Sequence, residues 1–292
     1  MGIKTPFISE IARDTFAINE FGLAAMYLLV GDEKAMLIDT GCGVCDLKAV
    51  VSKLTDKPYD VVLSHGHMDH VGGLGQFDSV FMGEADFDLA RHLDFDFLKK
   101  YLDMLGRMGG YAVYDYSNEN IQPIARMPEF YPIHEGDIFE LGNRAVEAFE
   151  VPGHTPGGIC FMDDKTGILF SGDSCNTNLL AANASVTTTL RALDKLKALE
   201  HRFSRNFNGH IGYAGTPECR SLPDRVLDDC IYILESVLNH TDVPDVKMFL
   251  GRRNIGMNYG CARVTYNPDR LLDEGEEPVR PGSLHITAAG SQ

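Results

Sequence analysis

Four side chains able to bind a metal lie within six positions of the chain, in the segment Ser64–His70. They are His65, His67, Asp69 and His70, and histidine is scarce, with ten in the whole sequence. Imidazole and carboxylate groups are the ligands of zinc and of neighbouring first-row metals. A cluster of this density is hard to attribute to chance, so the segment predicts a metal site.

Three later loops each carry one further candidate ligand. Each loop contains glycine and follows an apolar run, and the candidates are His154, Asp173 and His210. Any one of them alone would indicate a turn with a solvated polar side chain. Together they repeat the arrangement of the first cluster, a His or Asp at the end of a strand. We therefore expect these loops to converge over one edge of a sheet.

The apolar pattern around these loops predicts a sheet covered by helices. Two apolar runs, Met26–Val30 and Lys34–Asp39, are separated by a short polar segment that is typical of a hairpin. Helical spacing begins at Asp46 and a short strand follows at Val61–Leu63, which favours parallel pairing of the strands on either side of the helix. Further strands are predicted at Ala145–Val151, Ile159–Met162, Ile168–Phe170 and Arg263–Tyr266, and helices at Ser185–Glu200 and Pro223–Asn239.

Residues 84–130 have a different character. Apolar side chains recur at helical spacing as far as Gly109-Gly110, whereas Tyr111–Pro132 is rich in Tyr, Asn and Pro and predicts an irregular connection. The aromatic side chains of this segment either form a lid that shapes a substrate pocket or pack its helices against the rest of the domain. Nearer the C-terminus, Met248–Tyr266 is ambiguous before its final strand.

The composition indicates a globular protein that acts on neither nucleic acid nor membranes. The 292 residues are 44% apolar, enough to bury a large core, and the formal net charge of −16 repels phosphate backbones and anionic lipid. No run approaches the roughly 18 consecutive apolar residues that span a bilayer, and Leu23–Val30 is typical of a strand rather than of a signal peptide. Seven cysteines, an odd number in a long chain, fit reduced thiols and a cytoplasmic location.

Cys42 and Cys45 have the spacing of redox and zinc motifs, but no second pair of cysteines accompanies them. We interpret both as ordinary small residues. The alternative is a thiol whose pKa is lowered at the N-terminus of a helix.

These motifs resemble those of the metallo-β-lactamase fold superfamily, whose hallmark is His-x-His-x-Asp-His followed by a distant His, an Asp and a final His. The resemblance covers roughly residues 15–215 and includes Asp39-Thr40-Gly41 after an early strand. It implies an α/β fold, an αββα four-layer sandwich with the metal site at one edge of two facing sheets. The chain would form a single domain over residues 1–292, with a helical insertion at about 84–130 and a C-terminal extension at about 215–292.

The resemblance also implies a role for each of the seven candidate ligands. The cofactors would be two divalent ions, Zn²⁺ in the first instance, with iron or manganese as alternatives. One ion would be bound by His65, His67 and His154, the other by Asp69, His70 and His210, with Asp173 as the bridging carboxylate. Asp69 and Asp173 would act in catalysis by positioning the ions and their bound hydroxide. Tyr213, three residues beyond His210, either polarises a substrate carbonyl or fills its loop.

Departures from other branches of the superfamily narrow the chemistry. Two ions about 3.5–4 Å apart can hold hydroxide while polarising the bond under attack, in esters, thioesters, lactones, amides or phosphodiesters. Zinc β-lactamases of the main type carry Cys where this chain has Asp173, and flavodiiron oxidoreductases usually carry Glu in place of His67. The nucleases of the superfamily need basic surfaces or extra domains. The sequence looks most like the glyoxalase II and lactonase branch.

We therefore expect a hydrolase of a small thioester, ester or lactone. A phosphodiesterase that uses the same dinuclear site is one alternative, and a non-catalytic, metal-retaining effector-binding protein is another. The expected partner is a small-molecule substrate, with assembly into a homo-oligomer left open.

Overall fold

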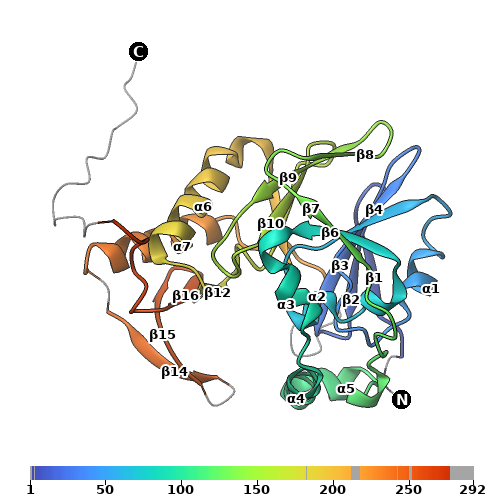
Figure 1. Cartoon of the computed structure of the whole chain (residues 1–292), viewed down its shortest axis with the longest axis horizontal. Helices are drawn as coiled ribbons and strands as arrows, with labels where there is room; N and C mark the ends of the chain where they lie inside the picture. Colours follow the sequence, from blue (N-terminus) through green and yellow to red (C-terminus); the bar gives the residue numbers. More distant parts are fainter. Residues whose placement is uncertain are drawn as a thin grey trace.

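Two β-sheets lie face to face between two layers of helices in the computed structural model (Figure 1). The structure describes residues 2, 4–181, 183–211, 218–241, 243–249 and 252–276. The strands of the N-terminal sheet all precede those of the second sheet along the chain, so each sheet is built mainly from consecutive strands.

The first sheet combines an antiparallel half with a parallel half. In the described part of the chain its strands, in spatial order, are β1 (Phe7–Ala12), β2 (Thr15–Glu20), β3 (Ala24–Val30), β4 (Ala35–Ile38), β5 (Tyr59–Val62), β6 (Ser79–Gly83) and β7 (Glu129–Ile133). Strands β3 and β4 form the hairpin that their apolar runs predict. β5 joins β4 in parallel across helix α1 (Leu47–Val51), as expected for two strands separated by a helix.

The second sheet supplies the later site loops. Among the described residues its strands, in spatial order, are β13 (Arg205–Asn208), β11 (Ile168–Gly172), β10 (Ile159–Asp163), β9 (Ala145–Glu150) and β8 (Ile138–Glu140). Strands β10 and β11 form an antiparallel hairpin, whereas β11 and β13 pair in parallel. Parallel strands end at the same edge of a sheet, so the chain leaves β11 and β13 side by side.

Apolar side chains fill the spaces between the layers. Tyr27, Phe161 and Phe170 are among those buried between the two sheets. The predicted helices near the C-terminus are confirmed as α6 (Val186–Ala198) and α7 (Val226–Leu238), which cover the outer face of the second sheet, while α1 covers that of the first (Figure 1). The αββα sandwich is therefore as predicted. No helix within the described ranges is long and apolar enough to cross a membrane.

The segment between β6 and β7 is largely helical. It contains α3 (Phe87–Arg91), α4 (Phe95–Leu105), a helical turn at Gly106–Gly110 kinked at Gly109 (φ 145°), and α5 (Tyr111–Val113), so the mostly helical segment predicted up to Gly109-Gly110 is confirmed. Tyr114 and Tyr116 are buried, and each ring lies 5.5 Å from that of Phe21, centroid to centroid. These two rings therefore pack the segment against the first sheet.

The prediction of an irregular connection over Tyr111–Pro132 is wrong at both ends, since α5 begins at Tyr111 and a strand follows at the other end. Strand β7 occupies Glu129–Ile133 and pairs in parallel with β6 at the edge of the first sheet. Pro132 has no N–H to donate, but an edge strand has one side without a neighbour and tolerates proline there. A Pro-containing stretch can therefore close this sheet although it would disrupt a central strand.

The C-terminal strands form a third, smaller sheet together with β12 (Asn178–Ala181). Its strands, in spatial order among the described residues, are β12, β16 (Ala262–Tyr266), β15 (Arg252–Tyr259) and β14 (Asp245–Phe249). The predicted strand at Arg263–Tyr266 is confirmed, and β15 occupies most of the ambiguous stretch before it. Helix α7 packs on one face of this sheet, and the β14–β15 hairpin extends away from the sandwich (Figure 1).

Candidate metal centre

The first four candidate ligands lie where β5 ends. The chain leaves β5 at Val62, runs through an extended loop that contains His65 and His67, and enters helix α2 (Met68–Val71). Asp69 and His70 lie on this single helical turn, and the N–H of His70 donates to the carbonyl of His67 at 2.9 Å. A strand end followed by one tight turn thus directs four side chains into a small volume.

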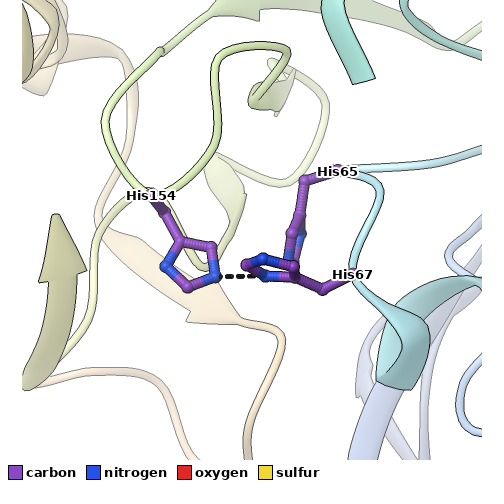
Figure 2. A group of neighbouring side chains, drawn as sticks. All are labelled: His65, His67 and His154. Atoms are coloured by element: carbon purple, nitrogen blue, oxygen red, sulfur yellow. Dashed lines mark hydrogen bonds between the residues drawn. The ribbon is translucent and has the colours of Figure 1, made fainter. Parts of the chain in front are cut away.

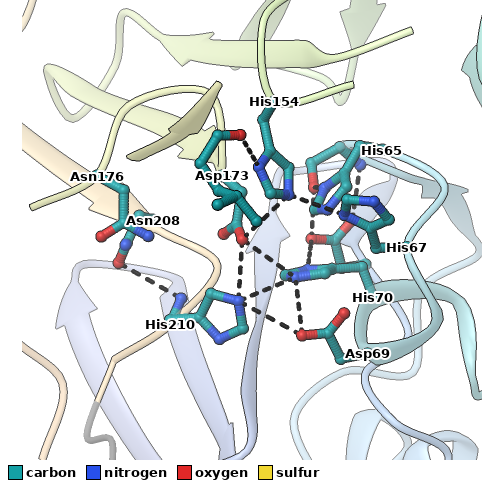
Figure 3. Close-up of polar contacts among 12 residues, drawn as sticks. His65, His67, Asp69, His70, His154, Asp173, Asn176, Asn208 and His210 are labelled. Atoms are coloured by element: carbon teal, nitrogen blue, oxygen red, sulfur yellow. Dashed lines mark hydrogen bonds and ion pairs between the residues drawn. The ribbon is translucent and has the colours of Figure 1, made fainter. Parts of the chain in front are cut away.

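The other three candidates come from the second sheet. His154 lies in the loop between β9 and β10, Asp173 directly follows β11, and His210 follows β13 after one glycine. The N–H of Gly209 donates to the carbonyl of Gly172 at 2.9 Å, which holds the last two loops together. Figure 3 shows all seven side chains pointing into one space between the two sheets' loops.

Three imidazoles form one group of this centre, His65, His67 and His154 (Figure 2). One ring nitrogen of each lies within 4.8 Å of the others. His67 Nδ1 and His154 Nε2 face each other at 2.8 Å. Three convergent imidazole nitrogens match the protein ligand set of a His₃ metal site.

A second group contains Asp69, His70 and His210. His210 Nε2 lies 3.4 Å from His70 Nε2 and 3.5 Å from Asp69 Oδ2. Asp173 lies between the two groups, since its Oδ2 is 3.0 Å from His210 Nε2 and 3.6 Å from His154 Nε2. The structure therefore brings together all seven residues that the sequence singles out, and it places one carboxylate against both groups.

Buried partners fix the far side of these rings. Asp39 has a left-handed backbone (φ 65°) and its Oδ2 lies 3.0 Å from His70 Nδ1. The same oxygen accepts from Ser64 Oγ at 2.7 Å, and Ser64 Oγ lies 3.0 Å from His65 Nδ1. One carboxylate thus orients a ring in each group, and such outer partners set the tautomer and orientation of metal-binding histidines.

Backbone carbonyls orient two other rings of the centre. The carbonyl of Leu180 lies 2.8 Å from His154 Nδ1, and that of Leu23 lies 3.2 Å from His210 Nδ1. Each Nε2 is consequently left to face the centre.

The donor set fits divalent metal ions. Within the described part of the chain, two buried atoms of the centre, His65 Nε2 and Asp173 Oδ1, have no hydrogen-bond partner. Such atoms are costly to bury unless something binds them. All seven side chains offer nitrogen or oxygen donors, which suit zinc and its first-row neighbours.

Two rings are held neutral. Burial, followed by the nearby His70 and His154, keeps the pKa of His65 well below its ordinary value. Burial and His154 lower the pKa of His67 to about 3. Both rings therefore carry a free nitrogen lone pair at neutral pH, as a metal ligand must.

In the second group, neighbouring carboxylates favour the protonated form of the two histidines when no metal is bound. Burial alone would lower the pKa of His70, but Asp69, the hydrogen bond with Asp39, and Asp173 together raise it to about 10. The pKa of His210 is also raised, because Asp173 and Asp69 outweigh the effect of burial. The pKa of Asp173 is held well below its ordinary value, since His210 and His70 more than offset burial.

Metal affinity should therefore rise with pH well above neutrality. A proton on His70 must leave before a metal can bind, and it is lost only as the pH approaches about 10. Competition between the metal-free protein and a chelator for Zn²⁺, at pH 7, 8 and 9 and corrected for the chelator's own protonation, should show an increase of about tenfold per pH unit for each proton displaced. An affinity that is constant over this range would contradict protonated histidine at the site.

A methyl group at Gly209 should disturb both groups at once. A Cβ there would lie 2.4 Å from His70 Cε1 and 2.9 Å from Asp173 Oδ1. We expect Gly209→Ala to weaken zinc binding by about tenfold or more, because displaced ligands lose their geometry. Gly153→Ala is the matched control, since it stands next to His154 but its Cβ meets only the side chain of Thr189, at 2.9 Å. Equal zinc affinities for the two variants would rule out this steric effect.

The sequence analysis did not identify two buried carboxylates near the centre, Glu20 and Asp86. Glu20 accepts the N–H groups of Cys42, Val44 and Cys45, and its burial leaves no exposed surface. Asp86 accepts from two loops of the centre. The partners are 20 or more positions away along the chain, so spacing alone could not have identified either residue.

Cys42 and Cys45 are both buried and free. Burial, followed by the neighbouring Glu20, raises the pKa of each thiol well above its ordinary value. The alternative of a thiol with a lowered pKa is therefore wrong, and the two cysteines fill space beside the Glu20 carboxylate. Tyr213, the remaining candidate, lies outside the described residues.

The fold and the His/Asp cluster define a class of protein, and the comparison with protein families agrees. The model of the metallo-beta-lactamase superfamily matches residues 20–203, and the chain belongs to this superfamily. Among solved structures, a metallo-beta-lactamase family protein from Thermus thermophilus has a TM-score of 0.53 at 19% identity, over 81% of this chain and 85% of that one. This likeness concerns the fold.

Curated relatives share about half of the chain. An acyl-coenzyme A thioesterase, MBLAC2, from Bos taurus is 31% identical over 166 residues, 51% of this chain and 57% of that protein. A hydroxyacylglutathione hydrolase, GloC, from Haemophilus influenzae is 30% identical over 151 residues, 50% of this chain and 64% of that protein. The matched part therefore spans little more than half the length of these relatives.

Proposed function

We propose that this protein is a metal-dependent hydrolase of a small thioester, ester or lactone, with two divalent ions, Zn²⁺ in the first instance, at the centre. One observation carries the proposal: seven His and Asp side chains converge in overlapping groups, with Asp173 Oδ2 within 4 Å of both His154 Nε2 and His210 Nε2. Ions bound by such a site lower the pKa of a water molecule to about 7 and polarise a carbonyl, which is the chemistry that hydrolysis requires.

The residues of the chain have distinct parts in this proposal. His65 and His67, which burial keeps neutral, would hold one ion together with His154. Asp69, His70 and His210 would hold the other, once His70 has lost the proton that Asp69 and Asp173 favour. Asp69 stays ionised, because His70 and His210 outweigh the effect of burial on its pKa, so its carboxylate can accept a hydrogen bond from a water at the centre.

The relatives favour thioesters within this range of substrates. One is named a thioesterase of acyl-coenzyme A and another a hydrolase of hydroxyacylglutathione. The net charge of −16 also favours a small substrate over nucleic acid.

The test combines metal analysis with a substrate panel. We expect about two equivalents of metal per chain, and turnover on acyl thioesters that is lost on chelation and restored by Zn²⁺. The panel contains thioesters followed by thiol detection, a p-nitrophenyl ester, a lactone and bis(p-nitrophenyl) phosphate. Turnover of the phosphodiester alone would replace this proposal with a phosphodiesterase. Bound metal without turnover on any substrate would favour a non-catalytic effector-binding protein.

A further inference from the structure

Asp86 is a fully buried carboxylate that joins two loops of the metal centre. It ends the short 3₁₀ turn Glu84–Asp86 after β6, and it has no exposed surface. Its Oδ2 accepts the N–H of Gly66 at 2.9 Å, and its Oδ1 accepts the N–H of Gly157 at 2.8 Å. Gly66 lies between two candidate ligands, and Gly157 lies three residues after a third.

The position of Asp86 makes this use of its carboxylate unusual. It immediately precedes α3, where an Asp side chain ordinarily accepts an N–H of the first helical turn. Asp86 makes no such capping hydrogen bond. Both of its oxygens are instead directed to the two loops.

The two glycines allow this close approach. A Cβ at Gly66 would lie 2.9 Å from the carbonyl oxygen of Asp86, and a Cβ at Gly157 would lie 2.7 Å from its backbone nitrogen. Contacts this short cannot be accommodated without movement of the backbone. Both loops therefore press directly on the backbone of Asp86 while its side chain binds their N–H groups.

The two loops supply one complete group of candidate ligands. His65 and His67 flank Gly66, and His154 belongs to the loop of Gly157. Where the two loops face each other, His67 Nδ1 and His154 Nε2 are 2.8 Å apart. The second group, with Asp69, His70 and His210, donates no hydrogen bond to the Asp86 carboxylate in the described structure.

We propose that Asp86 is a positioning residue that sets the spacing of the two loops and thereby the metal affinity of the group formed by His65, His67 and His154. It reaches the metal only through the backbone of these loops. The inference rests on metal binding at the proposed centre and does not depend on which substrate is hydrolysed.

The test is zinc binding by the full-length, metal-free protein. In Asp86→Asn, an amide replaces one oxygen and presents an N–H donor to an N–H donor, so one of the two loop contacts is lost. We expect one of the two zinc ions to bind about 10- to 100-fold more weakly in competition with a chromogenic chelator, the magnitude typical of lost outer partners. Asp86→Ala should weaken the same ion further, while the second ion keeps its affinity within about threefold.

Asp94→Asn is the matched control. Asp94 also accepts a backbone N–H, that of Phe97 at 2.9 Å, and lies in the same segment, but it caps the exposed start of α4. Its zinc affinities should equal those of the wild type. Cobalt substitution supplies a second readout, because loss of one ion should remove part of the visible absorption of the Co²⁺ protein.

Unchanged affinities for both ions in Asp86→Asn and Asp86→Ala would overturn the inference. Equal weakening of both ions, with a matching fall in the melting temperature of the metal-free protein, would also overturn it, since that pattern marks a general structural role. If the thioester panel shows no turnover but one ion is selectively weakened, the proposed function fails and the role of Asp86 stands.

Discussion

Asp173→Ala should reduce the metal content of the purified protein from about two equivalents to one or fewer and lower hydrolysis by about 10³-fold. Asp173 Oδ2 lies 3.0 Å from His210 Nε2, 3.6 Å from His154 Nε2 and 3.9 Å from His70 Nε2. Removal of this carboxylate takes away an anionic group whose oxygen directly faces ring nitrogens of both groups of ligands. Elemental analysis and the thioester assay measure the two effects.

Asp173→Asn separates charge from shape. It keeps the volume of the side chain but loses the negative charge that raises the pKa of His210. We expect an intermediate metal content and an activity close to that of Asp173→Ala. Two full equivalents of metal in Asp173→Ala would refute a bridging role for this residue.

Arg144→Met should lower the free energy of unfolding by about 3–5 kcal/mol. The side chains of Arg144 and Asp163 have no exposed surface, and the guanidinium donates to both carboxylate oxygens, at 3.2 and 2.6 Å. It also donates to the carbonyl of Asp14 at 2.9 Å and to Thr15 Oγ1 at 2.7 Å, so it links the second sheet to the first. Without Arg144, Asp163 is left as a buried charge with no cation beside it.

Denaturant unfolding of the metal-free protein measures this loss. The matched control is Arg202→Met, because Arg202 also pairs with two carboxylates, Glu147 and Asp164, but at the surface, where the expected loss is below about 1 kcal/mol. The double variant Arg144→Met/Asp163→Leu should recover part of the stability, since it removes both buried charges. Losses of the same size for Arg144→Met and Arg202→Met would contradict this explanation.

Much of the sandwich could be predicted from local pattern. The runs Met26–Val30 and Ile159–Met162 are apolar on both faces because both sheets are covered, and that pattern is visible in the sequence. The candidate site could also be predicted from the sequence, because its His and Asp residues lie in glycine-containing loops at the ends of strands. Those strand ends meet in space through parallel pairs such as β11 with β13.

Other features depend on partners far away along the chain. Strand β7 was missed because its proline is permitted only by its place at a sheet edge, and edge position is a property of the whole sheet. The role of Asp86 was missed because Gly157 lies 71 positions beyond it. Charge, spacing and local propensity carry no information about such contacts.

The distribution of the candidate ligands also bears on when the protein can acquire its metal. His70 and His210 are separated by 140 positions, yet their ring nitrogens lie 3.4 Å apart. At a synthesis rate of about 5–20 residues per second, the first cluster leaves the ribosome roughly 7–28 seconds before its last partner. The early cluster supplies only four of the seven proposed ligands, so at the proposed centre we expect metal binding to follow completion of the second sheet. On the proposed function, metal would then enter a folded domain, and its supply at that moment, as much as the preference of the ligands, would decide which ion is retained.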